Sequence, residues 1–334
     1  MTFTLSEILK CIKNRKMLII SFLFIFWCAS YLFLPLNITE ENASFEISEG
    51  SNINDITEQL VEIKILRGSF RFKLLTLVFN KREDLKRGHY KLNADATALD
   101  LLDMLAYGKE SLYSIYFAEG FTSAEMIKKI KENKHIKKTL KSYDSESILK
   151  VISSDKKYLE GLFFPDSYYF YKNTSDIEIL QNSNSVLNRK LQSAWDNRSE
   201  GLPYKDMYEA LIIASIIEKE VGVLEEAQII AGVFVNRINI GMPLQSDPTV
   251  IYGMGKRFNG NITRKDLKRD TPYNTYTRKG LPPSPISLPS LNSIEAALNP
   301  AKTNSLYFVA KGNRRHHFSA TLKEHNRAVR KYQK

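Results

Sequence analysis

The chain has 334 residues, of which 43% are hydrophobic and 25% are charged, and its formal net charge is +11. This composition is typical of a folded protein and excludes one that is disordered along its whole length. The positive charge favours anionic partners, but no zinc-ligand spacing or base-reading basic helix indicates nucleic-acid binding. Both cysteines, Cys11 and Cys28, lie near the N-terminus, so the rest of the chain has no disulfide framework or cysteine nucleophile. The five histidines lack metal-ligand spacing, the adjacent His316 and His317 are interpreted as surface residues, and we expect no metal and no cofactor.

An apolar run without charges extends from residue 17 to residue 36. Its length of about twenty residues is enough to cross a bilayer as a helix. Four cations precede it closely, and positive charge marks the cytoplasmic side. We therefore predict a cytoplasmic tail over 1–16, a single transmembrane helix over 17–36, and a catalytic part in the periplasm, anchored to the inner membrane. A cleaved signal peptide is the alternative, but no small-residue cleavage site follows Leu36.

Residues 43–109 are predicted to form a first, compact α/β subdomain. Period-two alternation starts at Phe45, and helical periodicity follows it. The predicted elements are a strand near Phe45, helices over 53–64, 69–79 and 98–107, and a strand over 89–92. Gly108 is placed to end the last of these helices.

Residues 110–334 alternate helices, short strands and irregular segments, which predicts a larger, mixed α+β domain. Thr122 and Glu125 have the spacing of a capping box and start a helix. The lysine-rich stretch over 128–141 is interpreted as a solvated helix face, and residues 242–300 are predicted to be a long irregular segment of functional type. Further helices are expected over 177–196, 207–219, 225–240, 294–298 and 324–332, and strands over 111–117 and 305–310.

The helix expected over 207–219 is apolar almost all round, as buried helices are. Glu218 shares a face with Leu211 and is therefore carried into an apolar wall. Burial raises the pKa of a carboxylic acid, and a protonated carboxyl can donate its proton to a glycosidic oxygen. The alternative is a helix-end Glu that faces water or pairs with Lys219. Glu220 points about 200° around the helix, away from Glu218, where it could reach a different wall or cap the loop that follows.

The irregular segment carries candidates for sugar binding. Gln245, Tyr273 and Asn274 offer amides and an aromatic ring, a mixture that satisfies sugar hydroxyls and packs on pyranose faces. Asp247 is a candidate to stabilise charge from across a cleft. For each of these residues, an ordinary structural turn is the alternative interpretation.

Several short motifs follow one another in a fixed order. They are Glu218–Glu220, Val233–Arg237, Leu244–Gly253, Thr271–Tyr276, Gly280–Ile286, Ala297–Pro300 and Leu306–Ala310. From about Phe45 to the C-terminus, the chain resembles the endolytic murein transglycosylase family, also called the YceG-like family. The resemblance implies an α+β fold with a membrane anchor and a LysM-like first subdomain.

The resemblance also implies a function and a site. A member of this family cuts peptidoglycan strands internally, at the β-1,4 bond from MurNAc to GlcNAc, with Glu218 as the catalytic acid. One carboxyl group suffices, because the C6 hydroxyl of MurNAc closes a 1,6-anhydro ring without water. Gln245, Asp247, Tyr273 and Asn274 would bind the glycan. Such an enzyme would end the elongation of new strands, beside penicillin-binding proteins.

Three other functions compete with this one. A non-catalytic, anchored wall-binding scaffold would also account for the basic charge and the LysM-like subdomain. A hydrolase with Asp247 as its base would add water to its products, so product mass separates it from a transglycosylase. A pyridoxal-phosphate lyase acting on aminodeoxychorismate is disfavoured, because that chemistry belongs in the cytoplasm and this chain carries a predicted export anchor.

Overall fold

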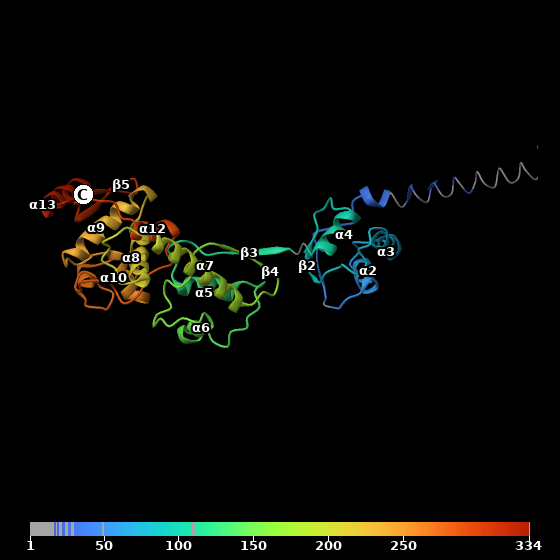
Figure 1. Ribbon diagram of the computed structural model, residues 1–334, viewed down its shortest axis with the longest axis horizontal. Coiled ribbons are helices and arrows are strands. Elements are labelled where there is room, and N and C mark those ends of the chain that lie inside the picture. The colour runs from blue at the N-terminus through green and yellow to red at the C-terminus, as the bar shows by residue number, and fades with distance from the viewer. Residues whose placement is uncertain are drawn as a thin grey trace, which may run out of the picture. The chain divides into compact units, whose positions relative to one another are not determined.

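The computed structural model (Figure 1) divides into two compact units, Met1–Tyr113 and Ser114–Lys334. It describes residues 17, 19, 22–23, 26–27, 30–48, 50–108 and 111–333. The predicted cytoplasmic tail over 1–16 lies outside these residues. Among the described residues, no helix combines the length and the apolar character of a membrane span. The transmembrane helix over 17–36, where several residues are not described, stays a prediction.

Over residues 43–108, with residue 49 not described, the first unit contains a two-stranded antiparallel sheet and three helices, in the order that the sequence predicted. Strand β1 (Ser44–Ile47) pairs with β2 (Gly88–Lys91) so that Phe45 lies opposite Tyr90. The helices are α2 (Ile53–Glu62), α3 (Ser69–Val78) and α4 (Ala98–Tyr107). Their apolar faces form one core, which includes Ile56, Leu60, Phe72, Tyr90 and Leu101. Gly108 ends α4 with a φ of 64°, the left-handed conformation predicted for it.

The second unit is built around helix α8 (Met207–Glu220). It packs against α7 (Asp176–Asp196), α9 (Ala227–Asn239), α10 (Asp247–Met254) and α12 (Leu291–Leu298), which surround it in Figure 1. Every residue of α8 from 210 to 217 is buried. The sequence predicted this burial, because a helix that is apolar on all sides has no face suited to water.

The remaining elements lie around this helical core. Strands β3 (Leu112–Tyr116) and β4 (Ser167–Tyr171) form one two-stranded sheet. Strands β5 (Tyr307–Gly312) and β6 (Arg315–Ser319) form an antiparallel hairpin against which the last helix packs. The other helices are α5 (Ser123–Glu132), α6 (Ser145–Val151), α11 (Arg264–Lys268) and α13 (Leu322–Tyr332).

The structure confirms some local predictions and corrects others. The capping box at the start of α5 is present, since the Thr122 backbone donates to Glu125 at 2.7 Å and the Glu125 backbone donates to the Thr122 hydroxyl. Helix α5 ends at Glu132, so the lysine-rich stretch over 128–141 is not one helix face. The segment over 242–300 contains α10 and α11, and β6 is a strand that the sequence analysis did not predict.

Candidate active site

The last turn of α8 carries two carboxyl groups, Glu218 and Glu220. Successive helix residues are separated by about 100°, so the two side chains leave the helix in nearly opposite directions. Both are only partly exposed. Their surroundings differ completely.

Glu218 is bound to the start of α12. Its Oε2 accepts hydrogen bonds from the Ser290 backbone N–H at 2.9 Å, the Ser290 hydroxyl at 2.6 Å and the Ser293 hydroxyl at 2.7 Å. Ser290 is the N-cap of α12, so Glu218 satisfies donors at the positive end of this helix. An anionic carboxylate suits this position, and Glu218 joins α8 to α12.

The segment that leads into α12 is tied to α8 one turn before Glu218. The Ile286 backbone donates to the Ser215 hydroxyl at 3.0 Å, and the Ser287 hydroxyl donates to the Ser215 carbonyl at 3.1 Å. On its other side this segment pairs with the turn after Glu119, where the Gly120 N–H donates to Leu288. These bonds hold the segment against α8 and so place Ser290 within hydrogen-bond distance of Glu218.

Glu119 is a second carboxyl group in the neighbourhood of Glu218. Partial burial raises the pKa of Glu119, and repulsion by Glu218 and Asp166 raises it further. Lys219, between Glu218 and Glu220, donates to the Gly120 carbonyl at 3.2 Å. Lys219 is therefore held beside the Glu119 turn by the backbone of that turn.

Glu220 lies in a different environment, at the wall of a cavity. It accepts a hydrogen bond from the Ser246 hydroxyl at 2.6 Å. Burial raises the pKa of Glu220 to about 7, against the opposing effect of the Ser246 hydrogen bond. The nearby charge of Asp247 raises this pKa further, and Arg237 lowers it. A carboxyl group with such a pKa is partly protonated at neutral pH and can act as a general acid.

The cavity beside Glu220 has a volume of about 500 Å³. Asp247 lines it at the first position of α10 and accepts a hydrogen bond from the Tyr276 hydroxyl at 2.6 Å. Gln245 also lines it, with a φ of 50° that places it in the left-handed region. The structure therefore brings together two predicted residues, Gln245 and Asp247, and joins them to Glu220.

The other two predicted binding residues have different surroundings. Asn274 is buried, and its amide donates to the carbonyls of Leu267 and Arg269 at 3.0 and 2.7 Å. Tyr273 donates to or accepts from the Ser284 hydroxyl at 2.7 Å, and its ring lies edge-on to Tyr252. Neither residue lines the cavity beside Glu220. Asn274 is positioned to hold the loop that carries Tyr276.

Several lining residues were not proposed as site residues from the sequence, and they include Tyr276, Arg237 and His316. The sequence indicated a surface position for His316, whose side chain is 11% exposed and lines the cavity. Arg237 is buried, and its guanidinium donates to the carbonyls of Leu306 and Leu244, each at 2.6 Å. It thereby joins α9 to β5 and to the loop before Gln245. In the sequence, the only indication of this role was the position of Arg237 in the motif Val233–Arg237.

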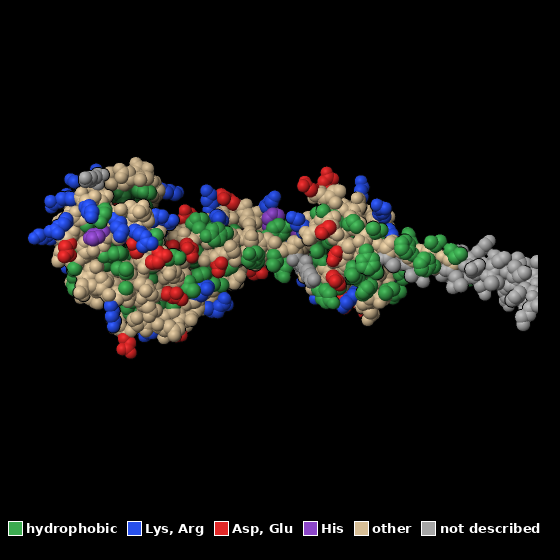
Figure 2. Space-filling view, turned by 90° about the horizontal axis from the view of Figure 1, so that it is seen from above, with side chains coloured by type: hydrophobic (Ala, Val, Ile, Leu, Met, Phe, Trp, Pro, Cys, Tyr) green, Lys and Arg blue, Asp and Glu red, His purple; other side chains and the backbone are tan. Residues whose placement is uncertain are grey.

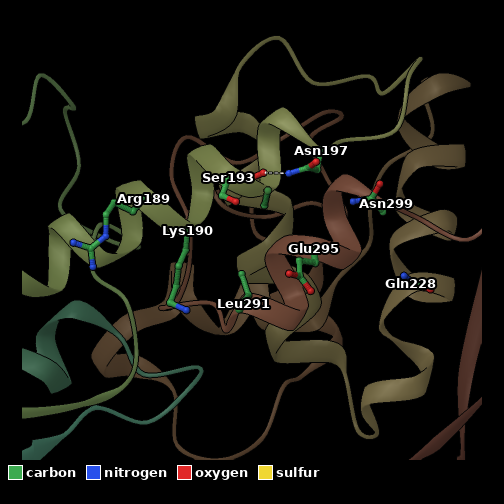
Figure 3. Close-up of a pocket in the computed structure, with 9 residues that line it drawn as sticks. Arg189, Lys190, Ser193, Asn197, Gln228, Leu291, Glu295 and Asn299 are labelled. Atoms are coloured by element: carbon green, nitrogen blue, oxygen red, sulfur yellow. Dashed lines mark hydrogen bonds between the residues drawn. The ribbon is translucent and has the colours of Figure 1, made fainter.

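A second cavity of about 550 Å³ lies on the outer face of α12 (Figure 3). Its lining mixes cations, amides and one carboxylate, and includes Arg189, Lys190, Asn197, Gln228, Glu295 and Asn299. These side chains come from α7, α9 and α12 and from the residues that follow α7 and α12. Neither glutamate at the end of α8 lines this cavity.

The fold is α+β, and the site is a cavity lined by the carboxyl groups of Glu220 and Asp247 and by tyrosines. The model of the YceG-like family matches residues 45–331, and the chain belongs to this family. The crystal structure of a yceG-like protein from Listeria monocytogenes matches with a TM-score of 0.54 and 31% identity, and covers 85% of this chain and 97% of that one.

Two relatives have the name endolytic murein transglycosylase. The one from Bacillus subtilis (strain 168) is 29% identical over 316 residues, which cover 88% of this chain and 86% of the relative. The one from Streptococcus pneumoniae serotype 2 is 28% identical over 311 residues, 83% of this chain and 56% of the relative. The chain thus spans little more than half of the streptococcal protein.

Proposed function

We propose that this protein is a lytic transglycosylase that cuts peptidoglycan strands internally and leaves 1,6-anhydroMurNAc ends. Family membership and the names of the relatives support the reaction class. The observation that carries the assignment to a site is the raised pKa of Glu220, about 7, at the wall of a cavity of about 500 Å³. An acid that keeps its proton near neutral pH is what glycosidic cleavage requires.

In the proposed reaction, Glu220 donates its proton to the oxygen that links MurNAc to GlcNAc. The bond from C1 to this oxygen breaks, the GlcNAc part leaves with a hydroxyl group, and positive charge develops at C1. The negative charge of Asp247 lies on the same cavity and stabilises this centre. The C6 oxygen of MurNAc then attacks C1, and its proton passes to the Glu220 carboxylate. The acid is restored and no water is consumed.

The geometry favours Glu220 over Glu218 as the proton donor. Glu218 is the residue that the sequence analysis assigned to this role, and that assignment stays a prediction. Its Oε2 is occupied by three hydrogen bonds from Ser290 and Ser293, whereas Glu220 accepts one and lines the cavity. Replacing each glutamate separately by Gln decides between them.

We further propose that the first unit binds glycan as a LysM-like module. The order of β1, α2, α3 and β2, with the two strands antiparallel, supports this reading. The net charge of +11 belongs to the whole chain and suits an acidic wall polymer as a partner of the protein, but it does not single out the first unit. Figure 2 shows Lys and Arg side chains spread over the larger unit, with a group at the end that carries α13 in Figure 1.

The cellular setting is also a proposal. The apolar run over 17–36 and the cations before it support a single-pass anchor in the inner membrane, with the N-terminus cytoplasmic and the catalytic domain periplasmic. In this position, the enzyme would meet new strands as they leave the membrane and would end their elongation. Penicillin-binding proteins of the synthesis machinery are then its expected neighbours.

The deciding experiment incubates the purified full-length protein with uncrosslinked glycan strands and weighs the products. A transglycosylase yields anhydro ends inside the strand, whereas a hydrolase yields products heavier by one water. A wall-binding scaffold would retain the strands uncut. If the wild-type protein gives only hydrated ends or no products, the proposed reaction is wrong.

A further inference from the structure

The hairpin of β5 and β6 contributes a histidine to the Glu220 cavity. His316 lies on β6, opposite Ala310 of β5, and lines the cavity together with Glu220 and Asp247. The mechanism above does not use this side chain. The next residue, His317, points to the opposite face of the strand, because side chains alternate along a β-strand.

The His316 ring is held by a buried carboxylate. Glu226, which is 6% exposed, accepts the His316 backbone N–H at 3.0 Å and contacts the ring Nδ1 at 2.8 Å. In the tautomer with its hydrogen on Nδ1, the ring donates to Glu226 Oε2, which also accepts the His316 backbone N–H. The lone pair of this tautomer lies on Nε2.

Packing fixes the orientation of the ring as well. Phe308 lies edge-on to His316 with ring centroids 5.4 Å apart, and Phe234, which is fully buried, lies edge-on to Phe308 at 5.9 Å. These contacts leave the ring little freedom to turn. The ring lines the cavity, and among the described residues none forms a hydrogen bond with Nε2.

The hairpin is also seated directly against the chain that follows Glu220. A Cβ atom added to Gly222 would lie 2.0 Å from the Arg314 carbonyl oxygen, so only glycine allows this approach. Residues 220 to 226 therefore carry the acid, the contact that seats the hairpin, and the carboxylate that orients His316.

We propose that His316 Nε2 is a hydrogen-bond acceptor for a hydroxyl or amide N–H of the glycan in the Glu220 cavity, and that Glu226 is its positioning residue. This inference rests on the proposed function, because it names a contact to the substrate of that site. Sugars with acetamido groups are rich in such donors, and a neutral imidazole with one fixed tautomer accepts from them without carrying a charge.

Two substitutions of His316 test the two ring nitrogens separately. In His316→Asn the amide nitrogen replaces Nδ1 and still donates to Glu226, but nothing replaces Nε2. In His316→Gln the amide oxygen reaches the place of Nε2, and the bond to Glu226 is lost. We expect His316→Asn to raise KM about tenfold with a smaller change in kcat, the effect of one lost hydrogen bond. We expect His316→Gln to keep a KM nearer to wild type and to melt at a lower temperature.

Glu226→Ala frees the ring while leaving the imidazole in place, and it should raise KM as His316→Asn does. His317→Asn is the matched control and should leave KM unchanged. The measurements are kinetics of anhydro-product release by the full-length protein, with a thermal melt for each variant.

The inference is overturned if His316→Asn has the KM of the wild type. It is also overturned if His316→Asn and His316→Gln raise KM by the same factor and this rise follows their loss of melting temperature. The ring would then have only a structural role. An inactive wild-type protein would contradict the proposed function instead.

Discussion

Two glutamates of one helix turn, Glu218 and Glu220, have opposite surroundings. Glu218 accepts three hydrogen bonds at the positive end of α12, from Ser290 and Ser293. Glu220 accepts one from Ser246, lies beside a negative charge, and has a pKa raised to about 7. The two carboxyl groups therefore differ in what surrounds them: three donors at Glu218, and one donor with a neighbouring negative charge at Glu220. A nearby negative charge raises the pKa of a buried carboxyl group, as it does at Glu220.

The largest expected effect comes from removing the acid. Glu220→Gln keeps the shape of the side chain and loses the transferable proton, and we expect kcat to fall by about 10²- to 10⁴-fold. Mass spectrometry of anhydro ends measures this loss. Glu218→Gln is the matched control, from the same turn of α8. If Glu218→Gln folds and is inactive while Glu220→Gln works normally, the acid is Glu218, as the sequence analysis predicted.

The pH dependence tests the same comparison without changing the binding groups. Activity should fall as pH rises above about 7, because Glu220, whose pKa is about 7, then loses its proton. Rates of anhydro-product release between pH 5 and pH 9 would follow this fall. A rate that keeps rising through this range would remove Glu220 from the acid role.

The free energy of unfolding should also depend on the protonation of Glu220. Between the usual pKa of 4.5 and about 7, the folded protein binds more protons at Glu220 than the unfolded chain does. The contribution of this group to stability therefore decreases as pH rises through that window, by at most about 3 kcal/mol, and is lost above it. Glu220→Gln has no such dependence, so its free energy of unfolding relative to wild type should increase from pH 5 to pH 8. Denaturant titrations at the two pH values measure the change.

Removing the other glutamate should act on stability first. Glu218→Ala leaves the Ser290 N–H and two hydroxyls without their acceptor, and we expect a loss of about 1–3 kcal/mol in the free energy of unfolding. Glu218→Gln keeps an oxygen for the Ser290 N–H and should lose less. Equal stability of Glu218→Ala and wild type would contradict the structural role given to this side chain.

Much of the fold could be predicted from the sequence, because local signals determine it. Helical periodicity and caps placed α4 and α8 to within a residue, and the capping box of Thr122 formed as expected. The short helices α10 and α11 were missed. Helices of eight and five residues are marginal on their own and depend on tertiary packing. Strand β6 begins with Arg and two His, and its pairing with β5 was not visible locally.

The site was predictable only in part, for a similar reason. The helical period places Glu218 and Glu220 on different sides of α8, and the composition of the irregular segment indicated Gln245 and Asp247 as site residues. Which wall faces the cavity depends on where distant segments arrive. Ser290 reaches Glu218, and Ser246 reaches Glu220, through loops whose course periodicity does not determine.

The smallest expected effect distinguishes charge from hydrogen bonding around Glu220. Asp247→Asn removes the negative charge that raises the pKa of Glu220, so the fall in activity should begin at a lower pH. It should also reduce the maximal rate by about tenfold, less than Glu220→Gln does, because Asp247 stabilises charge but donates no proton. Tyr276→Phe is the matched control, since it removes the hydrogen bond to Asp247 and leaves the charge in place. A shifted pH profile in Tyr276→Phe but not in Asp247→Asn would mean that the hydroxyl, rather than the carboxylate, determines the pKa of the acid.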